Sequence, residues 1–100
     1  MVLGEMTKAL YSCDKFENEV TDICNELAKL LVEKNRKYGD AALNPKQTFS
    51  KASPIELINV RMDDKLSRIK NAQTDDDEDP EWDLMGYLVL KRIAKNRGLK

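Results

Sequence analysis

Residues 60–69 read VRMDDKLSRI, and this stretch decides the fold because helical periodicity and paired charges coincide in it. Apolar residues recur around it at steps of three and four, as on one face of a helix. The stripe comprises Ile55, Ile58, Met62, Leu66 and Ile69. At about 100° per residue, Asp63 falls at the edge of this stripe and Asp64 lies further toward water. The simplest interpretation is a solvated helix face with charge pairs.

A long helix is predicted before this stretch. Apolar residues between Phe16 and Leu31 share one face, opposite a row of charged residues. Asp14 suits the N-cap, and the helix is expected to end near Tyr38, where Gly39 can adopt the left-handed conformation of a C-terminal cap. The preceding residues, 1–13, are expected to form an N-terminal arm or a short helix.

Residues 40–52 form the predicted connection between the first and the second helix. They show no period, and Pro45 excludes a continuing helix. The connection is longer than is usual between two packed helices, and long ordered loops often carry function. Its apolar members, Leu43 and Phe49, predict that the loop packs down on the core.

The second and third helices have clear start signals. Residues 53–56 read SPIE, a capping box with proline at the first helical position, and this helix should run to about Ala72. Residues 79–80 read DP and begin the third helix, which continues to about Asn96 before Gly98 ends it. The first half of the third helix is apolar nearly all round, so it is expected to be the most buried of the three.

These features predict an all-α fold with three main helices in an antiparallel bundle and a long loop between the first and the second. Residues 14–100 are expected to form a single helical domain. The acidic run at residues 75–79 is interpreted as a solvated turn, whose negative charge suits the start of the third helix.

Composition limits the classes of function. The 100 residues contain 17 Lys and Arg and 18 Asp and Glu, a balance that argues against a protein that coats nucleic acid. No apolar run could span a membrane and no signal peptide is visible, so a cytoplasmic location is expected. Without histidine, Cys13 and Cys24 cannot complete a zinc site, and Ser-His or Cys-His nucleophiles are excluded. Any chemistry must rest on carboxylates, and so on a hard metal such as magnesium.

Two residues of the third helix are unusual for a helix that contributes to a hydrophobic core. Asp83 stands among apolar neighbours, where an unpaired carboxylate would be costly, and Gly86 lowers the helix propensity. Both have structural explanations, because the helix dipole favours an acid in the first turn and a glycine permits close packing of another helix. The functional explanation is a ligand that approaches this helix.

Four blocks of the sequence together resemble a small phage-borne family, the nucleotide modification associated domain. They are KNRKYGDAALNP at 34–45, FS at 49–50, VRMDDKLSRI at 60–69 and DLMGYLVL at 83–90. The order of the blocks matches from about Glu33 to Ala94. Each block alone is weak, and the set is fairly specific.

That family is in turn distantly similar to the all-α nucleoside triphosphate pyrophosphohydrolases of the MazG and dimeric dUTPase group. The resemblance implies that Asp63 and Asp64 stand for one magnesium-binding acidic cluster, and Asp79 and Asp83 for the other. Ser67 and Pro80 occupy positions where those hydrolases have a further acid. The resemblance therefore supports binding of a metal or ligand more strongly than catalysis, because no spare base remains to activate water.

The first hypothesis is a protein that binds a nucleotide or nucleotide derivative, with magnesium-dependent triphosphate pyrophosphohydrolysis as the reaction class if it is an enzyme. Asp63, Asp64 and Asp83 would hold the metal, and Lys34, Lys65 and Arg68 would face phosphates. Three further residues, Asn35, Tyr38 and Asn44, would line the mouth of the pocket.

Two alternatives remain open. One is a non-catalytic anti-defence protein that sequesters a signalling nucleotide or inhibits a host defence protein of the CRISPR type. The width of the apolar stripes favours a homo-oligomer, a dimer or larger, in either case. The other is purely structural: Asp63 and Asp64 pair with cations of the first helix, and Asp83 pairs with Arg61 or Arg68.

Overall fold

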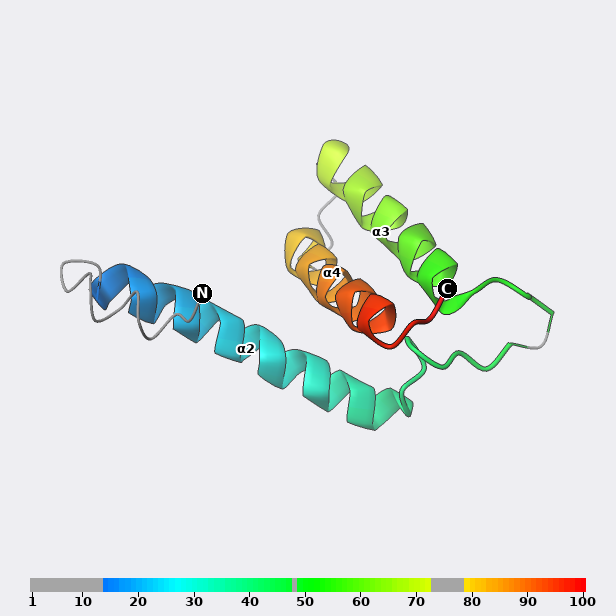
Figure 1. Cartoon of the computed structure of the whole chain (residues 1–100). Coiled ribbons are helices and arrows are strands. Elements are labelled where there is room, and N and C mark those ends of the chain that lie inside the picture. Colours follow the sequence, from blue (N-terminus) through cyan, green and yellow to red (C-terminus); the bar gives the residue numbers. More distant parts are fainter. Residues whose placement is uncertain (1–13, 48, 73–78) are drawn as a thin grey trace. The chain divides into compact units, whose positions relative to one another are not determined.

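The computed structural model describes residues 14–47, 49–72 and 79–100, and in these ranges it contains helices and no strand (Figure 1). The helices are α2 at Asp14–Tyr38, α3 at Pro54–Lys70 and α4 at Pro80–Asn96. The predicted all-α fold is therefore confirmed. None of the described helices is long and apolar enough to cross a membrane.

The chain divides into two compact units, Met1–Lys34 and Asn35–Lys100. In the first unit, α2 carries acidic residues in its first turn and Leu27 is its buried residue, whereas Phe16 and Ile23 are 69% and 46% exposed. The single domain and the three-helix bundle remain predictions. The expected N-terminal arm lies outside the described residues.

The second unit is built on α3 and α4, which pack side by side and run antiparallel (Figure 1). Four buried residues form its core: Leu43, Ile58, Met62 and Ala94. Partly buried side chains surround them: Ile55, Leu84, Tyr87, Leu90, Ile93 and Leu99. The core of this unit thus lies between the two helices and includes Leu43 of the preceding loop.

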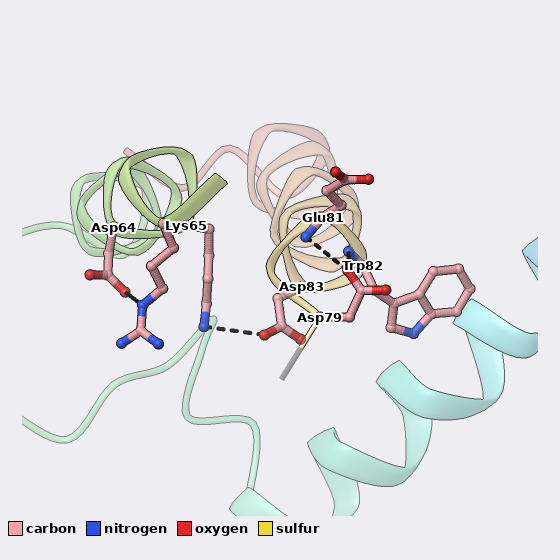
Figure 2. A network of polar contacts seen from close by, with 7 residues as sticks. Asp64, Lys65, Asp79, Glu81, Trp82 and Asp83 are labelled. Atoms are coloured by element: carbon pink, nitrogen blue, oxygen red, sulfur yellow. Dashed lines mark hydrogen bonds and ion pairs between the residues drawn. The ribbon is translucent and has the colours of Figure 1, made fainter. Parts of the chain in front are cut away.

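Capping side chains set the starts of both helices, as predicted. The Ser53 hydroxyl accepts a hydrogen bond from the Glu56 N–H at 3.1 Å. The Asp79 carboxylate accepts from the N–H groups of Glu81 and Trp82 at 3.1 and 3.2 Å (Figure 2). Each side chain satisfies backbone donors that have no partner within the first turn of a helix.

The two helices end differently. In α4, the Gly98 N–H donates to the Lys95 carbonyl and the Leu99 N–H to the Ala94 carbonyl, with Gly98 at φ +74°. This is a Schellman motif, and it includes the expected apolar contact because Leu99 packs on the core that contains Ala94. In α3 the last helical residue is Lys70, and Ala72 has left the helix with φ +51°.

Of the two apolar residues of the loop, one is buried in the core and the other is exposed. Leu43 is 6% exposed, as expected for a core residue, but Phe49 is 95% exposed. The prediction for Phe49 is wrong, because polar contacts hold this part of the loop. The Gln47 amide donates to the Ala52 carbonyl at 2.9 Å, and the Ala52 N–H donates to the Ser50 hydroxyl at 3.1 Å.

The sequence predicts that α4 is the most buried of the three helices, and its described residues include both buried and exposed apolar positions. Gly86 and Ala94 are buried, whereas Met85, Leu88 and Val89 are 39%, 52% and 37% exposed. The helix has apolar residues on two sides, and α3 covers one of them. The opposite side keeps an apolar surface that the rest of the second unit leaves accessible to solvent.

Candidate functional site

Two of the predicted site residues meet across the helix pair. The Lys65 ammonium on α3 lies 3.1 Å from the Asp83 carboxylate on α4, as Figure 2 shows. The Lys65 and Asp83 side chains are only 11% and 21% exposed. Lys65 follows Met62 by three residues and Ile58 by seven, so its aliphatic stem lies on the core side of α3 while its charged end reaches α4.

This ion pair adds to the structural interpretation of the sequence. Asp83 pairs with Lys65, a partner that the structural interpretation did not name. Arg61 is exposed, and Arg68 contacts Asp64 of its own helix. Because Lys65 is engaged by a carboxylate, its predicted role in facing a phosphate would require the ion pair to open.

Arg68 and Asp64 form a second pair, within α3. The Arg68 Nε lies 3.2 Å from the Asp64 carboxylate, in the i, i+4 relation that brings side chains together on a helix surface. Both side chains are more exposed than those of the first pair: 32% for Arg68 and 56% for Asp64. Asp64 thus has a local partner on α3, and its expected pairing with a cation of the first helix remains a prediction.

The other candidate ligand residues lie on the surface. Asn35 and Asn44 are exposed, and Tyr38 is 61% exposed, with the Lys37 ammonium 5.4 Å from the centre of its ring. Lys34 ends the first of the two units, whereas Asn35, Tyr38 and Asn44 belong to the second. The binding role of these residues remains a prediction.

The predicted magnesium ligands do not form one group. Across residues 14–47, 49–72 and 79–100, no cluster of three or more acidic or sulfur side chains is placed to hold a metal ion. Asp64 and Asp83 each contact a cationic side chain, and the Asp79 carboxylate caps α4. Magnesium binding remains a prediction, and any such metal would have to compete with these contacts.

The second unit contains a groove that the sequence interpretation missed. It has a volume of about 550 Å³ and lies along α3 and α4. Its lining residues are Glu56, Asn59, Met62, Asp63, Leu66, Leu84, Leu88 and Lys91. Four apolar side chains thus meet two carboxylates, one amide and one ammonium group. Apolar walls with a few polar groups are typical of small-molecule sites.

Asn59 has an unusual environment in this groove. Its side-chain oxygen is buried and has no hydrogen-bond partner among the residues that the structure describes. Leaving a buried polar group unsatisfied costs about 1–3 kcal/mol. A donor supplied by a ligand would recover that cost, after a small movement of the side chains that cover the oxygen.

Part of the groove could have been predicted from the sequence. Glu56, Asn59 and Asp63 follow one another at steps of three and four, so they form a polar row beside the apolar stripe of α3. The contribution of Lys91 depends on how α4 packs against α3, which local spacing does not reveal. Of the residues predicted for a site, only Asp63 lines the groove.

Comparisons of the chain with protein-family models, with curated proteins and with solved structures gave no match. The resemblance to the nucleotide modification associated domain therefore remains an interpretation of the sequence.

Proposed function

We propose that the protein binds a nucleotide or nucleotide derivative in the groove between α3 and α4, and that it holds the ligand without cleaving it. The observation that carries the proposal is the composition of the groove, in which an apolar wall, an amide, an ammonium group and two carboxylates line the same space. A nucleotide presents matching groups: a flat base, hydrogen-bonding base edges and a phosphate.

The base would lie on the apolar wall made by Met62, Leu66 and Leu84. The Asn59 amide would hydrogen-bond to the base edge, since exocyclic amino groups of adenine and cytosine donate to amide oxygens. The unsatisfied oxygen of Asn59 supports this role. Lys91 is the cation of the groove, and its ammonium suits a phosphate oxygen.

Sequestration is favoured over hydrolysis by the positions of the acids. Metal-assisted cleavage needs carboxylates that hold the ion and a group that activates water. Here Asp83 contacts Lys65 and Asp64 contacts Arg68, so a metal at either carboxylate would have to replace a cation that is already present. Binding in the groove requires neither pair to open.

The test is a thermal-shift screen of the full chain against nucleoside triphosphates and cyclic nucleotides, each with and without magnesium. A ligand that binds the folded state raises the melting temperature by mass action. We expect a shift that is independent of magnesium and is lost in Lys91→Met. The matched control is Lys95→Met, because Lys95 is an exposed lysine of the same helix that does not line the groove.

Asn59→Leu gives a second readout. This variant removes the unsatisfied oxygen, so the protein without ligand should be at least as stable as the wild type while losing the nucleotide shift. If the rise in melting temperature requires magnesium and disappears in Asp63→Asn, the groove is a metal–triphosphate site and sequestration is the wrong function. Pyrophosphate release would then be measured. The absence of any shift would overturn nucleotide binding.

A further inference from the structure

The outer side of α4 carries a self-complementary stripe, which is defined here as Glu81, Met85, Leu88 and Arg92. Steps of four, three and four residues keep these side chains within about 60° of one another on the helix. All four are exposed, Met85 at 39% and Leu88 at 52%. The stripe lies on the side of α4 opposite the buried Gly86 and Ala94, and Glu81 points away from the Lys65–Asp83 pair in Figure 2.

The residues along the stripe are arranged so that the stripe is complementary to a reversed copy of itself. An acid stands at one end, a base at the other, and two apolar side chains lie between them. The centre of the stripe falls between Gly86 and Tyr87, at equal spacing from Glu81 and Arg92 and from Met85 and Leu88. If a second α4 is laid on the first in the opposite direction about this centre, each acid faces a base and each methionine faces a leucine.

We propose that this stripe is the interface with a second copy of the same chain, related by a two-fold axis perpendicular to α4. A two-fold interface uses the same patch on both partners, so each contact occurs twice. Glu81 would pair with Arg92 of the second copy and Met85 would pack on its Leu88. The charge order selects the antiparallel arrangement, because a parallel one would place Glu81 on Glu81 and Arg92 on Arg92.

The two kinds of contact contribute differently. Burying the apolar surface of Met85, Leu88 and the adjacent Val89 supplies the driving force, since these side chains keep between 37% and 52% of their surface exposed. The ion pairs lie at the edges, where exposed pairs add little affinity but determine orientation. The interface is thus apolar at its centre and charged at its rim.

This inference is independent of the proposed nucleotide groove. Glu81, Met85 and Arg92 do not line the groove, whereas Leu88 borders both surfaces. Substitutions at Glu81, Met85 and Arg92 therefore report on association alone, and Lys91→Met reports on the groove alone.

Sedimentation velocity of the full chain across the micromolar range tests the proposal, with a reductant present because Cys24 is exposed. We expect a concentration-dependent dimer for the wild type and a monomer for Met85→Lys. The control is Val60→Lys, which adds the same charge at a residue of α3 that is 59% exposed and lies outside the stripe. A wild type that stays monomeric, or loss of the dimer in both variants, would overturn the proposal.

A charge exchange makes the test specific for the antiparallel arrangement. Glu81→Arg and Arg92→Glu should each raise the dissociation constant of the homodimer about tenfold, because each creates two like-charge contacts. Mixing the two variants should restore association, since every contact in the mixed dimer is again between opposite charges. The double variant Glu81→Arg/Arg92→Glu should also dimerise. If the mixture associates no better than its components, the arrangement is refuted.

Discussion

Replacing Asp83 by asparagine removes one charge from the contact between α3 and α4 while preserving the shape of the side chain. Lys65 would then keep an ammonium group in a side chain that is only 11% exposed, without the carboxylate that lies 3.1 Å away in the wild type. Breaking a fully buried ion pair costs about 3–5 kcal/mol. Exposed pairs contribute about 0–1 kcal/mol. With the Asp83 side chain 21% exposed, we expect a loss of about 2 kcal/mol.

Urea denaturation followed by circular dichroism measures this loss. The midpoint should fall with an unchanged slope, since the surface exposed on unfolding stays the same. In a thermal melt, a loss of this size in a domain of 60–100 residues corresponds to a melting temperature about 10 °C lower. The variant should still fold, because small proteins are stable by about 5–15 kcal/mol.

Asp64→Asn is the matched control, because it makes the same chemical change in an exposed pair on α3. Its expected cost is about 0.5 kcal/mol, as for other i, i+4 pairs on helix surfaces. Lys65→Met should cost less than Asp83→Asn, since the stem remains packed and Asp83 retains contact with water. If Asp83→Asn costs no more than Asp64→Asn, the ion pair does not hold the two helices together and the reasoning fails.

Three further substitutions test the packing and the helix ends by the same denaturation assay. Ile58→Ala should cost about 3–4 kcal/mol, because Ile58 is 2% exposed and its removal leaves a cavity between α3 and α4; a cost below about 1 kcal/mol would contradict that packing. Ser53→Ala should cost about 1 kcal/mol through loss of the hydrogen bond to the Glu56 N–H, and Ser53→Asp should restore most of it. Ala72→Gly should stabilise by about 0.5–1 kcal/mol, because Ala72 has φ +51°, and a lower midpoint would show that this conformation is not strained.

The helices were predictable because their signals are local. Proline and a capping side chain begin α3 and α4, and Gly39 and Gly98 adopt positive φ after α2 and α4. These signals act within a few residues, so no knowledge of the packing is needed to read them. The exposure of Phe49 was not predictable, because hydrogen bonds within the loop outweigh the preference of one apolar side chain.

The candidate site was less predictable because it depends on which residues of α3 face α4. The sequence places Leu66 in the apolar stripe, but the buried positions are Ile58, Met62 and Lys65, and Leu66 is 51% exposed. One position of the core-facing row is thus a lysine, and it takes Asp83 as its partner. Hydropathy assigns lysine to the surface, so periodicity alone favours the neighbouring leucine.

The Schellman motif at the end of α4 has a consequence for hydrogen exchange. The Gly98 and Leu99 amides are bonded to helix carbonyls, and opening these bonds would also pull Leu99 from the core that contains the fully buried Ala94. The Ala72 amide at the end of α3 is bonded to the Ile69 carbonyl, but the Ala72 side chain is exposed and its backbone is strained. Amide protons near Leu99 should therefore exchange through a larger opening of the α3–α4 pair, and those near Ala72 through fraying of a single turn.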